Sequence, residues 1–193
     1  DIIGLKPGVE TPAALSPLLI SRGTYFFCDT QINTDPTIAQ ISEMTLLAAE
    51  EVRRFGIRPK VALLSHSNFG TIDCKSAEKM RAAYADIRRR DPELEIDGEM
   101  QADAALSEAV RQRIMPNSQL TGQANIAFNM VKTFSDGISI GPILLGAARP
   151  AHILTPATTT RGIVNMTALA TVGSQIFDDA MTDNITHRLI KSA

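Results

Sequence analysis

Two short polar segments carry most of the side chains that could do chemistry. The first, Ser65-His-Ser-Asn-Phe-Gly70, directly follows the apolar run Lys60–Leu64, which is typical of a buried strand. In open α/β sheets, ligands lie beyond the carboxyl ends of the strands, and small hydroxyl and amide side chains beside a glycine let a phosphate group approach closely. The alternative is a polar turn that satisfies its own backbone groups. Both interpretations stay open for this loop.

The second segment is Asp97-Gly-Glu-Met-Gln-Ala-Asp103, which places three carboxylates at a predicted strand-to-helix junction. Paired carboxylates serve as general acids and bases, and they also bind hard cations. The commoner use of negative charge at such a junction is to cap the N-terminus of a helix. We therefore favour a structural role for this segment.

Several other kinds of site are excluded or disfavoured by spacing. A hydrolase dyad of Ser65 or Ser67 with His66 is disfavoured, because adjacent loop residues rarely reach the required geometry and no G-x-S-x-G motif is present. No Cys/His spacing fits a zinc site, and the chain has neither a G-x-G-x-x-G nor a Walker motif. The sequence thus predicts no dinucleotide site of those types.

Composition is that of an ordinary globular protein, with 193 residues, 44% hydrophobic, 21% charged and a net charge of −2. These values predict one domain or two small lobes, and they argue against a nucleic-acid face or a membrane-binding basic patch. Cys28 and Cys74 lie in unrelated contexts, which fits a reducing compartment and predicts a cytoplasmic protein. The apolar stretch 138–154 is interrupted by prolines and an arginine, so we expect no membrane span. Because the chain begins with Asp1 rather than Met, we expect a piece of a longer polypeptide.

Strands and helices are predicted to alternate along the chain, which favours an α/β fold with a mostly parallel sheet. A first helix should begin at Asp35-Pro36, with Asp35 as its cap, and should end at Gly56. The further helices expected from apolar periodicity are 76–90, 102–110, 124–134, 163–172 and 175–190. The expected strands are 18–20 and 24–28, paired as a hairpin, and 60–64, 94–96, 138–145 and 152–154.

Four segments resemble the phosphate acetyl/butyryl-transferase family, and together they span most of the chain. They are Ala48–Gly56, Val61–Ser65, Asp97–Leu106 and Gly141–Asn165. The last resembles the family pattern GPILQGLAKPVNDLSRG followed by EDIVN. Within it, the segment His152-Ile-Leu-Thr-Pro156 is especially similar to the C-terminal domain of hybrid NADP-dependent malic enzymes. The resemblance implies a three-layer α/β/α phosphotransacetylase-like fold, of the isocitrate/isopropylmalate dehydrogenase-like kind. Residues 1–149 would be its second lobe, and residues 150–193 a unit that returns to a first lobe encoded upstream.

The chain departs from the family pattern where that pattern carries its reactive side chains. The family's Ser-Arg pair falls on Thr155 and Pro156, and its Asp falls on Gly162. A guanidinium binds phosphate through two parallel hydrogen bonds, and a carboxylate can accept a thiol proton, so their loss should remove much of the catalytic stabilisation. The resemblance therefore implies a pocket that binds a CoA thioester without transferring its acyl group. The ligand contacts that we expect are Ser65, Ser67, Asn68, Gly141, Thr155 and Asn165.

By resemblance, acetyl-CoA is an effector, and the domain is a regulatory part of an enzyme that converts malate to pyruvate and CO2. NADP and a divalent metal would bind in the malic-enzyme catalytic domain and not in this chain, and the whole would form a homo-oligomer. Two alternatives remain open. The chain is an active phosphate acetyl- or butyryltransferase if other groups replace the missing Arg and Asp. It is a structural oligomerisation domain if it binds no CoA thioester.

One further departure follows Gly122. The family pattern has a strand and a Pro-Asn-Leu-Asp loop before an Ala-Asn-Ile helix, whereas here Gln123 runs directly into Ala124-Asn-Ile126. Either that strand is deleted, or its residues are missing from this sequence. We favour the second, because loss of a central strand would leave a gap in the sheet.

Overall fold

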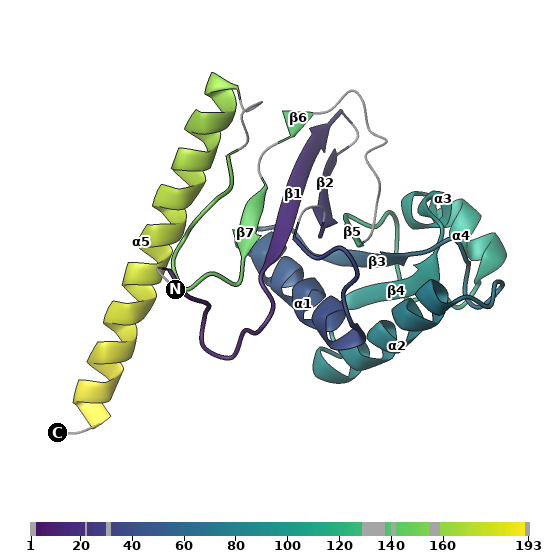
Figure 1. Cartoon of the computed structure of the whole chain (residues 1–193), viewed down its shortest axis with the longest axis horizontal. Coiled ribbons are helices and arrows are strands. Elements are labelled where there is room, and N and C mark those ends of the chain that lie inside the picture. Colours follow the sequence, from purple (N-terminus) through teal and green to yellow (C-terminus); the bar gives the residue numbers. More distant parts are fainter. Residues whose placement is uncertain are drawn as a thin grey trace.

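A mixed β-sheet with helices on both faces organises the protein (Figure 1). The computed structural model describes residues 3–21, 23–29, 32–128, 138–139, 142–154 and 159–191. The strands are β1 (Ala13–Ile20), β2 (Gly23–Cys28), β3 (Lys60–Leu64), β4 (Glu95–Met100), β5 (Ile126–Phe128), β6 (Ile138–Ser139) and β7 (Ile143–Leu145). The helices are α1 (Ile38–Arg54), α2 (Lys75–Arg90), α3 (Ala102–Leu106), α4 (Glu108–Ile114) and α5 (Thr160–Lys191).

The sheet has the order β4-β3-β5-β2-β1-β6, and β7 also pairs with β1. Neighbours from β4 to β2 are parallel, whereas β1 is antiparallel to β2, β6 and β7. The predicted α/β class is confirmed, and so is the hairpin, in which Leu19 pairs with Thr24. Its first strand is longer than predicted, because β1 begins at Ala13 instead of Leu18 and pairs with β7 there. The sheet is therefore mixed instead of mostly parallel as predicted, because this hairpin reverses the chain and β1 is antiparallel to each of its partners.

Successive side chains of β3 belong alternately to two hydrophobic clusters, one on each face of the sheet. Val61 and Leu63 belong to the larger cluster, which includes buried residues of α1 and α2. Ala62 and Leu64 belong to the smaller cluster, which includes Ala104 and its neighbours in α3. Because side chains on a strand point alternately to opposite faces, one short apolar strand serves both helical layers. The result is the predicted three-layer arrangement.

Helix α1 begins two residues later than the sequence suggested. Its N-cap is Thr37, whose hydroxyl accepts a hydrogen bond from Gln40 N–H, while the Gln40 side chain accepts one from Thr37 N–H. This reciprocal capping box satisfies two backbone donors at once, so Thr37 replaces the predicted cap Asp35. Asp35 instead pairs with Lys79 at 2.6 Å. The predicted end of the helix is confirmed, because Gly56 adopts a φ of 71° just after it.

The predictions for residues 94–134 need three corrections. Strand β4 continues through Asp97 and Gly98 to Met100 instead of ending at Ile96. The helix predicted over 102–110 is two helices, because Ser107 ends α3 and caps α4. The helix predicted over 124–134 is wrong at its start, where Ile126–Phe128 form β5, and residues 129–137 lie outside the described part.

Strand β5 lies between β2 and β3 and pairs with both. Ile126 is fully buried there. β5 also supplies hydrogen bonds to the edges of β2 and β3, which would otherwise be unpaired. Sheet pairing therefore overrides the local helical periodicity. β5 thus occupies the position between β2 and β3, where deletion of a central strand was expected to leave a gap.

The elements of the C-terminal region also differ from those predicted. Strands β6 and β7 replace the single strand expected over 138–145, and His152 forms only an isolated bridge with Ile143 in place of a strand over 152–154. The two helices predicted after residue 163 are one helix, α5, which lies along the β7 side of the molecule in Figure 1. The lobe boundary at residue 150 stays a prediction. In the part of the chain that the structure describes, no helix has the length and apolarity needed to cross a membrane.

Candidate functional site

The Ser65–Gly70 loop after β3 is fixed on the end of β4. Ser65 N–H donates to the carbonyl of Met100 at 2.9 Å, and Phe69 N–H donates to the carbonyl of Glu99 at 2.8 Å. Gly70 N–H donates to the Glu99 carboxylate, Oε1, at 2.8 Å. Two segments far apart in the sequence are thus hydrogen-bonded together at the carboxyl ends of β3 and β4, where the sequence analysis expected a ligand site.

Ser67 supports the loop from inside. Its side chain is completely buried, and its Oγ accepts a hydrogen bond from Ile72 N–H at 3.0 Å. The Ser65 Oγ accepts one from Ser67 N–H at 3.3 Å. The interpretation of the loop as a turn that satisfies its own backbone therefore describes much of what these two hydroxyl groups do.

Other groups of the loop face outward. Asn68 Oδ1 accepts a hydrogen bond from Gln101 N–H at 2.7 Å, and the Gln101 side-chain amide donates to the carbonyl of His66 at 2.9 Å. These contacts use the acceptor atom of Asn68 and leave its Nδ2 donors without a partner within the described residues. The imidazole of His66 is exposed, and the hydroxyl proton of Ser65 is available as well. The loop can therefore offer three side-chain donors to an anionic ligand.

The three carboxylates of the Asp97–Asp103 segment do not form one site. Asp97 accepts hydrogen bonds from Ser118 Oγ at 2.6 Å and from Gln119 N–H at 2.9 Å. Glu99 turns toward the loop, and Asp103 lies in the first turn of α3. The helix-capping interpretation holds for Asp103, whereas Asp97 and Glu99 are on β4. Among the residues that the structure describes, no cluster of His, Cys, Asp or Glu could hold a metal ion.

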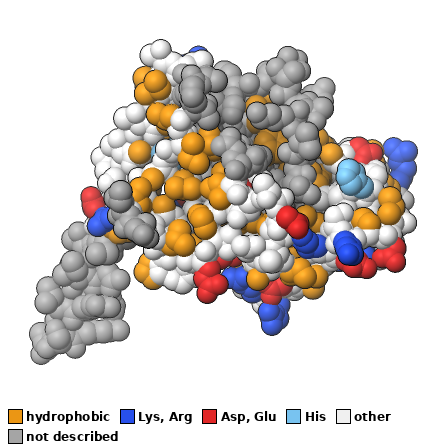
Figure 2. All heavy atoms as spheres, viewed as in Figure 1, with side chains coloured by type: hydrophobic (Ala, Val, Ile, Leu, Met, Phe, Trp, Pro, Cys, Tyr) orange, Lys and Arg blue, Asp and Glu red, His pale blue; other side chains and the backbone are white. Residues whose placement is uncertain are grey.

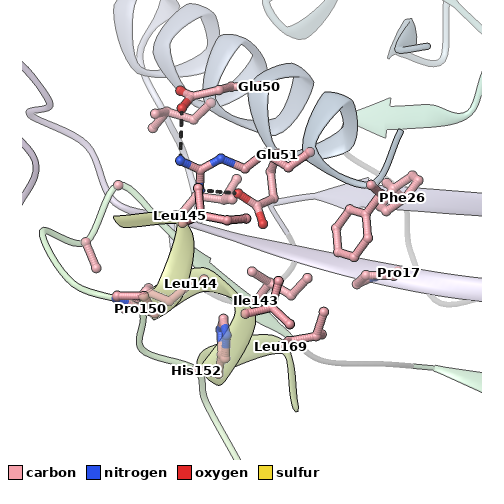
Figure 3. A pocket seen from close by; sticks show the side chains of 18 of the residues that line it. Pro17, Phe26, Glu50, Glu51, Ile143, Leu144, Leu145, Pro150, His152 and Leu169 are labelled. Atoms are coloured by element: carbon pink, nitrogen blue, oxygen red, sulfur yellow. Dashed lines mark hydrogen bonds and ion pairs between the residues drawn. The ribbon is translucent and has the colours of Figure 1, made fainter. Parts of the chain in front are cut away.

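A second candidate region is a cavity of about 540 Å³ between α1, the β1–β2–β7 sheet and α5 (Figure 3). Its volume is in the range of small-molecule sites. The walls are mainly apolar and include Phe26, Ile143 and Leu169, which are labelled in Figure 3. Figure 2 shows apolar side chains gathered in the middle of the face that is in view. The cavity can enclose an apolar group such as an acyl chain.

The charged side chains at the edge of the cavity are already paired. Arg54 lies 3.2 Å from Glu51 and 3.6 Å from Glu50, and Lys6 lies 3.6 Å from Glu50. Arg149 stacks over the ring of Phe177, with 4.2 Å between the guanidinium carbon and the ring centroid. An anionic ligand would have to compete with these carboxylates for Lys6 and Arg54.

His152 lies in the wall of this cavity, close to Ile143 and Leu144 (Figure 3). Both of its ring nitrogens are buried without a hydrogen-bond partner among the described residues. Burial lowers the pKa of His152 below its usual value, because a charged imidazolium would lose its hydration there. The ring is therefore neutral at pH 7.

The structure does not bring the six predicted ligand contacts into one place. Asn165 lines the cavity, whereas Ser65, Ser67 and Asn68 belong to the loop and do not line it. Gly141 and Thr155 lie outside the described residues. The sequence did not predict the role of Glu99 in holding the loop, although both segments were singled out. The cavity draws on segments far apart in the chain, so no local pattern could have indicated it.

The sequence profile of the family described as phosphate acetyl/butaryl transferase matches residues 1–171. The chain belongs to this family. Two solved phosphotransacetylases share the fold: that of Streptococcus pyogenes aligns with a TM-score of 0.82 at 28% identity, over 92% of this chain and 57% of that one. The EutD phosphotransacetylase of Staphylococcus aureus aligns with a TM-score of 0.79 at 27% identity, over 88% and 56%.

Malic enzymes are also similar to this member of the phosphate acetyl/butaryl transferase family. The NAD-dependent malic enzyme of Rhizobium meliloti is 50% identical over 90% of this chain and 24% of its own length. The NADP-dependent malic enzyme of Escherichia coli is 49% identical over 91% and 25%. The phosphate acetyltransferase of Paracoccus denitrificans is 37% identical over 88% and 59%. The chain thus spans about a quarter of the length of these malic enzymes, and it is similar to a domain of that class of protein.

Proposed function

We propose that this chain is the phosphotransacetylase-like regulatory domain of a malic enzyme, in which it binds acetyl-CoA and transfers no acyl group. The parent enzyme would oxidatively decarboxylate malate to pyruvate and CO2. Acetyl-CoA would act as an effector of that reaction. The nicotinamide nucleotide and the divalent metal would bind in the catalytic domain of that enzyme.

The observation that carries the proposal is a contrast between overall similarity and lost chemistry. Identity to malic enzymes is 47–50%, whereas identity to phosphate acetyltransferases is 30–37%. At the same time, Pro156 and Gly162 replace the guanidinium and the carboxylate that the transferase pattern places there. A ligand pocket kept without its reactive groups is what an effector-binding domain requires.

The surroundings of Gly162 support the proposed loss of transfer activity. Gly162 lies in the first turn of α5, where its N–H donates to Thr159 Oγ1 at 3.1 Å. It has no side chain to accept a thiol proton. Two guanidinium groups line the cavity: Arg54 is paired with Glu50 and Glu51, and Arg149 stacks over Phe177. Charge stabilisation of an acyl-transfer transition state would therefore be weak.

Two parts of the structure suit two parts of acetyl-CoA. The apolar cavity that Asn165 lines can enclose the acetyl group and part of the pantetheine arm. The outward donors of Ser65, Asn68 and His66 suit phosphate oxygens. Gly141 and Thr155 complete the set of proposed contacts, and Ser67 would act through the loop that it supports. Binding can regulate the catalytic domain only if acetyl-CoA has different affinities for two states of the whole enzyme.

The test is a calorimetric titration of acetyl-CoA into the complete polypeptide, with a parallel assay of acetyl phosphate formation on the same sample. Binding without turnover supports the proposal. Binding with turnover makes the domain an active transferase and refutes the argument from Pro156 and Gly162. Absence of binding in the folded protein leaves a structural, oligomer-forming role, which deletion of the domain would then reveal as dissociation of the assembly.

A variant in the cavity sharpens this test. Asn165→Ala should raise the Kd for acetyl-CoA roughly 3- to 10-fold, which is the change expected from the loss of one hydrogen bond. The same change should raise the acetyl-CoA concentration that affects malate oxidation. Asn117→Ala is the matched control, because Asn117 is exposed in the turn after α4, away from the cavity lining. Equal effector responses of the two variants would remove Asn165 from the site.

A further inference from the structure

Glu99 holds the far end of the Ser65–Gly70 loop. Its side chain is completely buried, although it carries a carboxylate. Oε1 accepts hydrogen bonds from Gly70 N–H at 2.8 Å and from the Arg81 guanidinium at 3.0 Å. The carbonyl oxygen of the same residue accepts one from Phe69 N–H at 2.8 Å. A single residue therefore binds two successive N–H groups of the loop.

This end of the loop depends on outside contacts because its backbone is unfavourable. Phe69 has a φ of 48° and Gly70 a φ of 87°, so both are in the left-handed region. A residue with a side chain is disfavoured there, and it persists only when its surroundings hold it. The hydrogen bonds from Phe69 and Gly70 to Glu99 supply that restraint.

Arg81 joins helix α2 to this contact. Its guanidinium reaches from the second turn of α2 to Glu99, and its side chain remains 37% exposed. The buried carboxylate thus has a charged partner at the surface, without which its burial would be costly. We call Glu99, Arg81 and the two N–H groups of Phe69 and Gly70 the Glu99 clamp.

We propose that Glu99 is a positioning residue for the ligand of this loop. The Glu99 clamp fixes the turn, and the nearby Gln101 N–H donates a hydrogen bond to Asn68 Oδ1, which leaves the Asn68 Nδ2 donors without a partner among the described residues. The clamp thereby presents the Asn68 amide and the Ser65 hydroxyl in one arrangement to phosphate oxygens of a CoA thioester. This inference rests on the proposed function for its ligand, but the restraint of the loop is independent of it.

The chain offers a matched control on the same strand. Glu95 is also a nearly buried carboxylate of β4, with ion pairs to Lys60 at 3.4 Å and to Arg58 at 3.3 Å. It lies at the opposite end of β4 from the loop and receives its hydrogen bonds from Thr121. Glu99→Gln and Glu95→Gln therefore remove the same charge from the same strand, and only the first disturbs the loop.

The experiment compares both variants in the complete polypeptide by amide hydrogen exchange, thermal unfolding and acetyl-CoA titration. For Glu99→Gln we expect exchange at Gly70 to accelerate by on the order of 10-fold, because a neutral amide oxygen replaces the carboxylate as acceptor of its N–H and the ion pair with Arg81 is lost. We also expect the Kd for acetyl-CoA to rise about 5-fold or more beyond the rise in Glu95→Gln, at a comparable Tm. Arg81→Met should shift both measurements in the same direction, since it removes the partner of Glu99.

Three outcomes overturn the inference. Unchanged exchange at Gly70 shows that the Glu99 carboxylate does not restrain the loop. Faster exchange with an acetyl-CoA affinity equal to that of Glu95→Gln shows a structural role alone. If the wild-type protein binds no acetyl-CoA, the proposed function and the ligand role of Glu99 both fail, and the exchange data still decide whether the clamp exists.

Discussion

Arg111 on α4 is a completely buried cation, and its replacement should destabilise the protein strongly. Its Nη1 donates to the carbonyl of Ala104 at 2.9 Å, and its Nη2 donates to the carbonyls of Leu120 and Gly122 at 3.1 and 2.7 Å. Its Nε donates to Ser118 Oγ at 3.1 Å, and Ser118 in turn donates to Asp97. The guanidinium therefore joins α3, α4 and the segment that leads to β5.

The magnitude of this effect follows from those contacts. Arg111→Met keeps much of the aliphatic volume but leaves three carbonyl acceptors unpaired, each at a cost of roughly 1–3 kcal/mol. Part of that cost is offset, because the variant no longer has to bury a charged group. We expect a net loss of about 3 kcal/mol in the free energy of unfolding, which is large for a single substitution.

Urea denaturation followed by circular dichroism measures this loss. The control is Arg113→Met on the same helix, because Arg113 is exposed and makes one 3.4 Å contact with the carbonyl of Ala109. That variant should stay within about 0.5 kcal/mol of the wild type. A result in which the two variants differ by less than about 1 kcal/mol would refute the reasoning, because the buried contacts would then contribute little.

Two further predictions concern titratable groups. Burial and the nearby Asp29 raise the pKa of Cys28, whereas a hydrogen bond with Ser76 lowers the pKa of the partly exposed Cys74. Iodoacetamide should therefore modify Cys74 in the native protein and Cys28 only after unfolding, as peptide mass spectrometry can show. Equal labelling would contradict this. Because the pKa of His152 is lowered below 6.5, the unfolded chain binds its proton at higher pH than the folded one, so the free energy of unfolding should fall as pH drops below about 6.5. His152→Phe should show a smaller fall between pH 7 and pH 5, and identical profiles would show that His152 does not titrate in this way.

The elements that the sequence predicted well are those with strong local signals. Strand β3, the hairpin of β1 and β2, and the ends of α1 and α2 follow from apolar runs, turn glycines and helical periodicity. The position of the Ser65–Gly70 loop after a buried strand was predicted for the same reason. Even the shift of the α1 cap from Asp35 to Thr37 stays within two residues, because adjacent polar residues compete for that position.

The elements that the sequence predicted poorly depend on pairing between residues far apart in the chain. The sequence Ala124–Phe128 has a helical spacing of alanines, yet Ile126 and its neighbours form β5 because β2 and β3 both need a partner there. Likewise, the strand predicted at 152–154 is reduced to one bridge, since β7 pairs chiefly with β1. Sheet pairing is decided by partners far along the chain, which a local window does not contain.

The sequence by itself determined the family, the α/β class and the absence of the family's Arg and Asp at Pro156 and Gly162, because these depend on residue identity in order along the chain. Only the tertiary structure decided how the polar segments act. The structure shows that Glu99, which the sequence left as a possible acid or base, is a buried hydrogen-bond partner of the loop. It also shows that Asn165 lines a cavity that Ser65 and Asn68 do not line. Hydrogen bonds, burial and cavities arise between residues brought together by folding, and those distances are set by the packing of the whole sheet and its helices.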